Sequence, residues 1–247
     1  MVYTRLIGSR SSDKPLFALL IDPDRTDGIR LDTTLKAARA AGVDLLLVGS
    51  SILLEKGAEE TVNAIKSVCD IPVVLFPGSN LQLTPHADAL LFLSLISGRN
   101  PDLLIGQHVQ AAPIVRRLGI ETIPTGYLLI DSGHPTAATY MSQSAPIPHD
   151  KDDIAAATAM AGELLGLKAI YLDAGSGARH PVRASMIRKV RASVGVPIIV
   201  GGGIRTPEHV AAACAGGADV VVVGNSVEQE TDVLFDLVAA TRMAARS

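Results

Sequence analysis

A short apolar run, a carboxylate and a glycine-rich loop follow one another in the segment Tyr171-Leu172-Asp173-Ala174-Gly175-Ser176-Gly177-Ala178. Residues 169–172 predict a buried strand, and Asp173 follows at its carboxyl end. The loop after Asp173 would expose backbone N–H groups, which bind anions such as phosphate. Taken alone, the segment fits one wall of a site for a phosphorylated substrate and a simple strand-to-loop turn equally well.

Two later glycine-rich stretches also follow apolar runs. Gly201-Gly202-Gly203-Ile204 comes after residues 197–200, and Gly224-Asn225 comes after residues 220–223. A glycine lets backbone amides approach an anion because no Cβ stands in the way, and a helix beginning near Asn225 could add its positive end. The three stretches together favour a phosphate site over the alternative that glycine is simply common at strand ends.

Carboxylates also follow the first predicted strand, where Asp22 and Asp24 flank Pro23. Mg²⁺ binds one or two protein carboxylates and completes its shell with water and substrate phosphates. Ser51, after the second predicted strand, could add a hydroxyl ligand. A turn that merely ends the strand explains the same spacing, and both interpretations stay open on spacing alone.

The elements that must position these residues alternate along the chain. Short apolar runs predict strands at 17–21, 44–48, 72–76, 89–95, 121–130, 169–172, 197–200 and 220–223. Amphipathic, mostly Ala-rich segments predict helices at 33–41, 59–68, 103–118, 152–165, 182–193, 208–215 and 231–244. Because continuously apolar strands are typical of parallel sheets buried on both faces, this order predicts one (β/α)₈ TIM barrel over residues 1–247. An open doubly wound sheet would carry its glycine fingerprint after the first strand, where this chain has Asp-Pro-Asp.

Three segments depart from a regular alternation. Residues 80–88 are too short and proline-broken for a full helix, so the third helix should be reduced or missing. Pro124 and Gly126 predict an interruption of the fifth strand. Residues 131–151 form the longest polar loop, a candidate lid or binding loop.

Composition excludes several classes of function. The net charge is −3, aromatic residues make up 3% of the 247 residues, and no basic run occurs, which argues against nucleic acid as a partner. No segment approaches the roughly 20 apolar residues of a membrane span, so we expect a cytoplasmic protein without an integral membrane segment. Cys69 and Cys214 are expected to be structural thiols in a reducing compartment. The histidines show no metal-ligand spacing, and His108 should be ordinary packing or surface.

A phosphosugar isomerase is an alternative function for such a barrel. Barrels of histidine and tryptophan biosynthesis also place Asp after the first strand and Gly-Gly-Gly-Ile after the seventh, and Asp131 could pair with Asp22 as acid and base. The histidine-pathway barrels need a second phosphate loop after the third strand, where this chain has only Phe76-Pro77-Gly78-Ser79. That hypothesis therefore ranks second, and a barrel that binds a phosphorylated ligand without catalysis is a third.

Six motifs, which follow one another along the chain, together resemble those of a known protein family. These are Ala18-Leu19-Leu20-Ile21-Asp22-Pro23-Asp24, Val48-Gly49-Ser50-Ser51, Pro124-Thr125-Gly126-Tyr127-Leu128-Leu129, the segment 171–178, Gly201-Gly202-Gly203-Ile204-Arg205 and Gly224-Asn225. Over nearly the whole chain the sequence resembles the geranylgeranylglyceryl phosphate synthase family, which also includes a heptaprenylglyceryl phosphate synthase. The resemblance implies transfer of a geranylgeranyl group from its diphosphate to the 3-hydroxyl of sn-glycerol 1-phosphate, a step of ether phospholipid biosynthesis.

The resemblance also implies roles for individual residues. Asp22 and Ser51 would hold Mg²⁺ on the diphosphate, Asp173 would be catalytic, and Tyr127 would line the prenyl pocket. Glycerol 1-phosphate would be bound by Tyr171, Leu172, Asp173, Ala174, Gly175, Ser176, Gly177, Gly202, Gly203, Gly224 and Asn225. The family usually has Glu where this chain has Asp173, which shortens the acid by one methylene.

No motif determines the length of the prenyl donor, the oligomeric state or contact with a membrane. A donor longer than C20, such as a heptaprenyl diphosphate, is an alternative, because donor length depends on the depth of the prenyl trough. A homo-oligomer is expected, since outer helices such as residues 152–165 could pack against a second copy. Transient contact with a membrane could release the lipid product.

Overall fold

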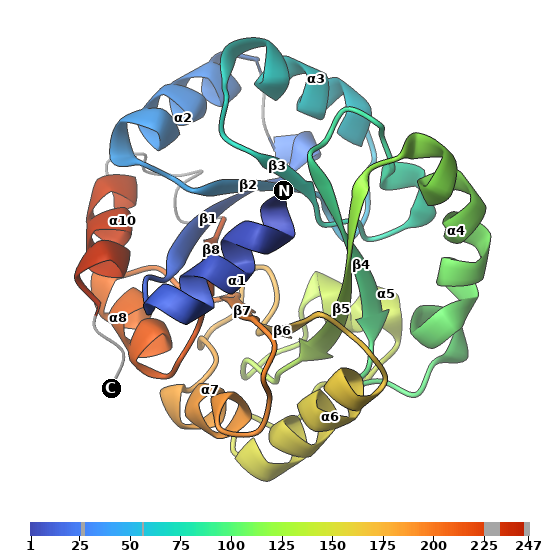
Figure 1. Ribbon diagram of the computed structural model, residues 1–247, viewed down its shortest axis with the longest axis vertical. Helices are drawn as coiled ribbons and strands as arrows, with labels where there is room; N and C mark the ends of the chain where they lie inside the picture. Colours follow the sequence, from blue (N-terminus) through green and yellow to red (C-terminus); the bar gives the residue numbers. More distant parts are fainter. Residues whose placement is uncertain (26–27, 56, 225–232, 245–247) are drawn as a thin grey trace.

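Eight parallel strands close into a barrel in chain order in the computed structural model, which describes residues 1–25, 28–55, 57–224 and 233–244 (Figure 1). The strands are β1 Leu16–Ile21, β2 Leu45–Val48, β3 Val73–Leu75, β4 Ala89–Leu95, β5 Glu121–Leu129, β6 Ala169–Asp173, β7 Ile198–Gly201 and β8 Val220–Val223. β8 pairs with β1, so the sheet has no free edge. The (β/α)₈ prediction is confirmed.

Helices surround the barrel as an outer ring (Figure 1). They are α2 Gly28–Ala41, α3 Ala58–Val68, α4 Gln107–Leu118, α6 Asp152–Leu164, α7 Ala184–Arg191, α8 Pro207–Ala215 and α10 Val233–Met243. Each helix turns an apolar stripe toward the strands, as Met186, Ile187 and Val190 do on α7. The seven helices predicted between residues 33 and 244 are all found in the described part of the chain. Most helix ends agree within two residues, but α2 begins five residues before the predicted start at 33 and α4 begins four residues after the predicted start at 103. The predicted start of the last helix at residue 231 lies outside the described residues.

Alternate side chains of the strands form two cores. Leu45, Leu47 and Ile199 point into the barrel, whereas Leu46 and Val200 pack outward against the helices. The register places Asp173 beside Leu129 on one side and Gly201 on the other. The predicted acid and the predicted phosphate loop therefore lie together at the carboxyl ends of the strands, where barrel enzymes place their sites.

The connection between β3 and β4 lacks an α-helix, as predicted. It contains only a short 3₁₀ turn, η2 Asn80–Gln82, in which the Ser79 hydroxyl accepts from the Leu81 N–H at 3.4 Å. The side of the barrel at β4 is covered instead by α4, which follows a π-helical turn, η3 Asp102–Gly106.

The predicted interruption of β5 was wrong. Pro124 and Gly126 lie inside one continuous strand that pairs with β4 over seven residues. Pro124 removes a single donor from the ladder, and its carbonyl still accepts from the Lys168 N–H at 2.7 Å. At Gly126 a Cβ would lie 2.8 Å from Ile96 Cδ1, so the glycine permits close packing and does not break the strand.

The amino-terminal helix α1 Val2–Ser12 was not predicted. It lies across the end of the barrel opposite the acid, where Val2 and Leu6 are buried against the inner core (Figure 1). The Glu121 carboxylate accepts from the N–H groups of Val2 and Tyr3 at 2.6 and 3.0 Å, which anchors the first turn. The helix was missed because its sequence is mixed polar and basic, with little amphipathic periodicity.

The long loop after β5 contains one short helix, α5 Ala137–Ser142, with Thr136 as its N-cap. The loop is tied back to the barrel by a bridge between Ile130 and Ile147. Among the helices that the structure describes, none is both long and apolar enough to cross a membrane.

Candidate active site

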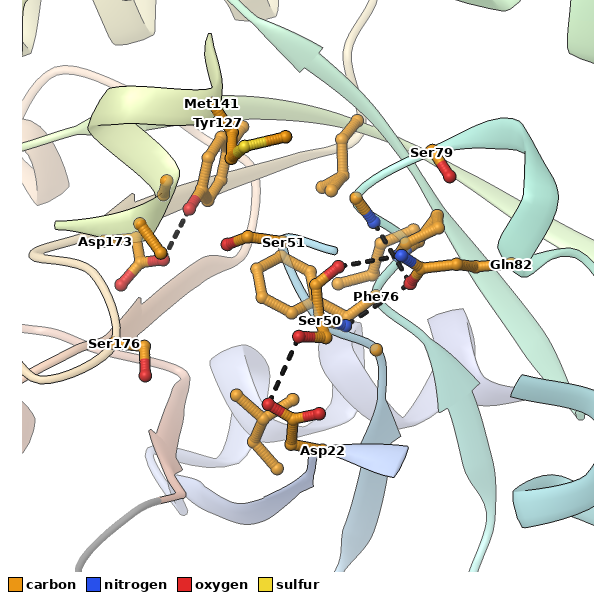
Figure 2. A pocket seen from close by; sticks show the side chains of 18 of the residues that line it. Asp22, Ser50, Ser51, Phe76, Ser79, Gln82, Tyr127, Met141, Asp173 and Ser176 are labelled. Carbon is orange, nitrogen blue, oxygen red and sulfur yellow. Dashed lines mark hydrogen bonds between the residues drawn. The ribbon is translucent and has the colours of Figure 1, made fainter. Parts of the chain in front are cut away.

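A cavity of about 640 Å³ opens at the carboxyl ends of the strands. Its wall is built by the loops after β1, β2, β3, β6, β7 and β8, by Tyr127 of β5, and by Met141 of α5 (Figure 2). Five residues of the segment 171–178 therefore face one space with the predicted metal side: Tyr171, Asp173, Gly175, Ser176 and Gly177.

Glycines form one wall of this cavity. Gly175, Gly177, Gly202 and Gly203 all have positive φ, between 72° and 89°, a conformation that L side chains rarely adopt. A Cβ on Gly202 would lie 2.5 Å from the Gly175 nitrogen and 2.7 Å from Asp173 Oδ1. Together with Ser176 and Gly224, these residues line the cavity as a glycine cradle, meaning the loops after β6, β7 and β8.

Two of the predicted phosphate-site residues turn their side chains away from the cavity. Leu172 and Ala174 pack in the outer core, so only their backbone borders the cradle. The predicted Asn225, and the helix expected to begin near it, lie outside the described residues.

Asp173 lies deep in the wall, with 6% of its surface exposed. Its Oδ2 accepts from the Tyr127 hydroxyl at 2.5 Å, and its Oδ1 accepts from the Gly175 N–H at 2.7 Å (Figure 2). Burial raises the pKa of this carboxyl, and these two hydrogen bonds offset part of the rise. The acid is thus held in a fixed orientation and is a stronger base than an exposed aspartate.

Three aromatic rings pack beside this acid. Phe76 stacks on Tyr171 with centroids 5.0 Å apart, and Tyr127 meets both rings edge-on at 5.8 and 5.5 Å. Burial and the Asp173 carboxylate raise the pKa of both tyrosines well above the usual value, so both phenols stay protonated at neutral pH.

Asp22 faces the cavity from the end of β1. Its Oδ2 accepts from the Ser50 hydroxyl at 3.2 Å and lies 3.4 Å from Arg25 Nε, and burial raises its pKa. Asp24 instead anchors the loop after β2, because its oxygens accept from the N–H groups of Leu54 and Glu55 at 2.7 and 3.1 Å.

Ser50, which the sequence did not single out, is therefore the serine that contacts Asp22. Ser51 lines the same cavity, but its hydroxyl points toward the Asp173 side (Figure 2). No cluster of three or more His, Cys, Asp or Glu in the described part of the chain could hold a metal by itself. One carboxylate and nearby hydroxyls fit a Mg²⁺ ion that takes its remaining ligands from substrate phosphate and water.

Gln82 was also missed. It is buried, and its amide joins two loops: Nε2 donates to the Ser50 carbonyl at 2.8 Å, while Oε1 accepts from the N–H groups of Ser50 and Gly78 at 3.3 and 3.2 Å. Only the three-dimensional approach of the two loops identifies this role, and no local sequence signal reveals it.

The cavity continues as an apolar arm between β4, η2 and α4. The arm is lined by Leu81, Leu83, Leu90, Phe92, Leu103 and Ala111. Because η2 is only a short turn, space remains between it and α4, which a full helix in this connection would fill. His108 also lies here, edge-on to Phe92 at 4.6 Å, and burial lowers its pKa. It packs against the core as expected, but it also lines the cavity, which the sequence did not predict.

The fold and the cavity define a (β/α)₈ barrel whose site joins a glycine cradle, a buried acid and an apolar arm. A model of the PcrB family matches residues 10–242. The chain belongs to this family.

The relatives agree with that assignment. A geranylgeranylglyceryl phosphate synthase of Chitinophaga pinensis is 50% identical over 99% of this chain and 97% of its own, and the protein of the same name from Spirosoma linguale is 50% identical over 94% and 93%. The crystal structure of (S)-3-O-geranylgeranylglyceryl phosphate synthase from Thermoplasma acidophilum, in complex with sn-glycerol-1-phosphate, superposes with a TM-score of 0.92 at 31% identity, covering 98% of each chain.

Proposed function

We infer that this chain is a prenyltransferase that transfers a geranylgeranyl group from its diphosphate to the 3-hydroxyl of sn-glycerol 1-phosphate. The observation that carries this inference is the joining of a glycine cradle, a buried acid and an apolar arm in one cavity. The names of the relatives and the ligand of the Thermoplasma enzyme support the same substrates.

The glycine cradle suits the acceptor. Backbone N–H groups of the loops after β6, β7 and β8 would bind the phosphate and orient the glycerol, so that its 3-hydroxyl lies near Tyr127 and Asp173. That hydroxyl attacks the first carbon of the prenyl chain, the bond to the diphosphate breaks, and Asp173 is the final acceptor of the hydroxyl proton.

The opposite wall suits the donor diphosphate. Asp22, with Ser50 and Ser51 nearby, would hold Mg²⁺ together with the diphosphate oxygens. Such an ion would offset the charge that develops on the leaving diphosphate. The arm between β4 and α4 would receive the hydrocarbon chain, and Tyr127 lies where the arm meets the acid.

Removal of the metal gives a direct prediction. Chelation with EDTA should stop product formation, and added Mg²⁺ should restore it, because the diphosphate is a poor leaving group without charge compensation. Asp22→Ala should lower turnover by at least about 10²-fold, while glycerol phosphate binding, measured by calorimetry, stays within threefold. Full activity in EDTA would contradict the Mg²⁺ assignment.

Donor length stays a prediction, with a heptaprenyl donor as the alternative to C20. The test is competition between C15, C20 and C35 diphosphates for labelled glycerol 1-phosphate, followed by chain-length analysis of the ether product. Preference for C20 by tenfold or more in kcat/KM supports the geranylgeranyl assignment, and preference for C35 replaces it.

The same assay tests the second-ranked function. An isomerase would need another phosphate cradle after β3, but the cavity wall there carries the Phe76 ring, stacked on Tyr171, and a single glycine, Gly78. Label from glycerol 1-phosphate should enter the organic phase only when a prenyl diphosphate is present. Absence of transfer with every donor would defeat the proposal.

Self-association is also proposed. The outer face of α6 exposes Ile154, Met160 and Leu164, and Leu165 follows directly after the helix with 81% of its surface exposed. Such residues are typical of a surface that a second copy covers. Light scattering should give a mass at least twice that of the chain, and Leu164→Glu should lower it; a monomeric wild type would contradict this.

A further inference from the structure

The nearly buried acid of this site is hydrogen-bonded to a tyrosine that is more exposed. Asp173 is 6% exposed, whereas Tyr127 is only partly buried and lines the cavity. The Tyr127 hydroxyl lies 2.5 Å from Asp173 Oδ2 (Figure 2), and both residues line the cavity. A hydroxyl group in the cavity can therefore contact the phenol that is hydrogen-bonded to the carboxylate.

The carboxylate is held at this depth from two sides. Its Oδ1 accepts from the Gly175 N–H at 2.7 Å and is so close to Gly202 that a Cβ there would lie 2.7 Å away. Asp173 also ends β6, whose ladder to β5 and β7 fixes its backbone. Because loop and strand both constrain it, the short side chain has little freedom to swing toward the cavity.

The direction of the short hydrogen bond is determined by chemistry. An ionised carboxylate can only accept, so the single phenolic hydrogen of Tyr127 points to Asp173. The lone pairs of the phenol oxygen are then free to accept from a group in the cavity. Packing of the Tyr127 ring edge-on against Phe76 and Tyr171 keeps the oxygen in this orientation.

We propose that the proton of the acceptor hydroxyl reaches Asp173 through the Tyr127 hydroxyl, so that Tyr127 is a catalytic residue as well as a wall of the prenyl site. This inference rests on the proposed prenyl transfer and adds the route of the proton. The glycerol oxygen bonds to the first prenyl carbon, and the carbon–oxygen bond to diphosphate breaks, with its electron pair leaving on the diphosphate. The hydroxyl proton passes to the Tyr127 oxygen while the phenolic proton passes to Asp173, which later releases it to solvent.

The alternative is direct transfer to Asp173, with Tyr127 only holding the carboxylate. The two routes respond oppositely to Tyr127→Phe. In a relay, the variant breaks the proton path. In direct transfer, the variant removes a donor that stabilises the ionised carboxylate, so Asp173 becomes a stronger base and turnover should persist.

The experiment compares Tyr127→Phe with Tyr3→Phe in single-turnover assays. Tyr3 lies on α1 at the closed end of the barrel, under the Lys168 ammonium, so its variant loses a phenolic hydroxyl far from the site. We expect Tyr127→Phe to lower the transfer rate by about 10²- to 10⁴-fold, with the Kd of glycerol 1-phosphate within threefold and an unchanged circular dichroism spectrum. Tyr3→Phe should match the wild type. A Tyr127→Phe rate within threefold of the wild type would overturn the relay.

A second measurement on the unmodified enzyme covers the case in which Tyr127→Phe does not fold. The wild-type transfer rate is measured in mixtures of H₂O and D₂O. A relay moves two protons in the same step and predicts a rate that curves with the deuterium fraction, whereas a linear dependence would overturn it. If the wild type transfers no prenyl group, the proposed function fails. If the wild type is active but Tyr127→Phe keeps its rate, or the rate depends linearly on the deuterium fraction, only the relay fails.

Discussion

Two opposing effects determine the pKa of Asp173. Burial in the wall of the barrel disfavours its charged form, while Tyr127 and Gly175 donate hydrogen bonds that favour it. The net effect is a raised pKa, and thus a carboxylate with more affinity for a proton than an exposed aspartate. A group that must accept a proton during transfer benefits from this balance.

Replacing the acid should separate activity from stability. Asp173→Asn should lower turnover by at least about 10²-fold, whereas binding of glycerol 1-phosphate stays measurable by calorimetry. Folding raises the pKa of Asp173 above its ordinary value of 3.8. At a pH between the ordinary and the raised pKa, the folded state therefore binds more protons than the unfolded state. The free energy of unfolding falls as the pH rises through that window. At neutral pH the buried, ionised Asp173 carboxylate lowers the stability of the folded state. The Asp173→Asn variant should therefore melt at the same temperature as the wild type or at a higher one. Near-normal turnover would remove Asp173 from the mechanism.

The same balance predicts the pH dependence of the reaction. Transfer requires ionised Asp173, so the single-turnover rate should fall as pH drops through its raised pKa, with a midpoint above 3.8. The Asn variant should show no such limb in its residual rate. Rates measured between pH 4 and 8 under single-turnover conditions test this, and a limb centred at or below 3.8 would contradict it.

At the scale of elements, the carboxyl ends of β6 and β7 work as a unit. Their register places Asp173 next to Gly201, and the Ala174 N–H donates to the Gly201 carbonyl at 3.0 Å. The two loops can approach this closely only because Gly202 has no Cβ. The cradle therefore depends on glycine at specific positions, of which Gly202 is the one that lets the loop after β7 lie against Gly175 and Asp173.

Substitution of Gly202 tests the cradle. Gly202→Ala should raise the KM for glycerol 1-phosphate at least tenfold, since its Cβ would displace the Gly175 amide and press on Asp173. Gly166→Ala is a matched control, because Gly166 also has a positive φ of 91° but a Cβ there meets nothing within 4 Å. Gly166→Ala should lose roughly 1 kcal/mol of stability from backbone strain. Gly202→Ala should lose more, because its Cβ also meets backbone atoms, and only Gly202→Ala should lose substrate affinity. Equal KM values in the two variants would argue against the cradle.

At the scale of the whole molecule, the barrel separates stability from function. One end carries the cavity, and the other is closed by α1, whose Val2 and Leu6 complete the inner core. This division is general for such barrels, in which the carboxyl ends of the strands carry the chemistry.

A truncation at the closed end should affect only stability. Leu6 is 1% exposed, so Leu6→Ala should lower the free energy of unfolding by about 2–5 kcal/mol. Its kcat/KM at a temperature well below the transition should stay within twofold of the wild type. Ile7→Ala, at a neighbouring position that is 37% exposed, should cost much less in chemical denaturation. A large loss of kcat/KM in folded Leu6→Ala enzyme would contradict this division.

Much of the barrel could be predicted because its strands are short apolar runs that alternate with helices. The prediction for β5 was wrong because the ladder to β4 keeps that strand continuous. The helix α1 was missed because it is held by a tertiary contact, the hydrogen bonds from its first turn to the Glu121 carboxylate. In the site, glycines and acids at strand ends were visible in the sequence. Ser50 and Gln82 were not, because their roles arise only where the loops after β1, β2 and β3 meet in space.

The central claim is transfer of a prenyl group to glycerol 1-phosphate, and one stoichiometric measurement tests it most directly. The enzyme is incubated with Mg²⁺, geranylgeranyl diphosphate and labelled sn-glycerol 1-phosphate, and both released diphosphate and labelled ether lipid are quantified. The account predicts equal amounts of the two products, with diphosphate release dependent on the acceptor. Diphosphate release without ether formation, or no release at all, would contradict it.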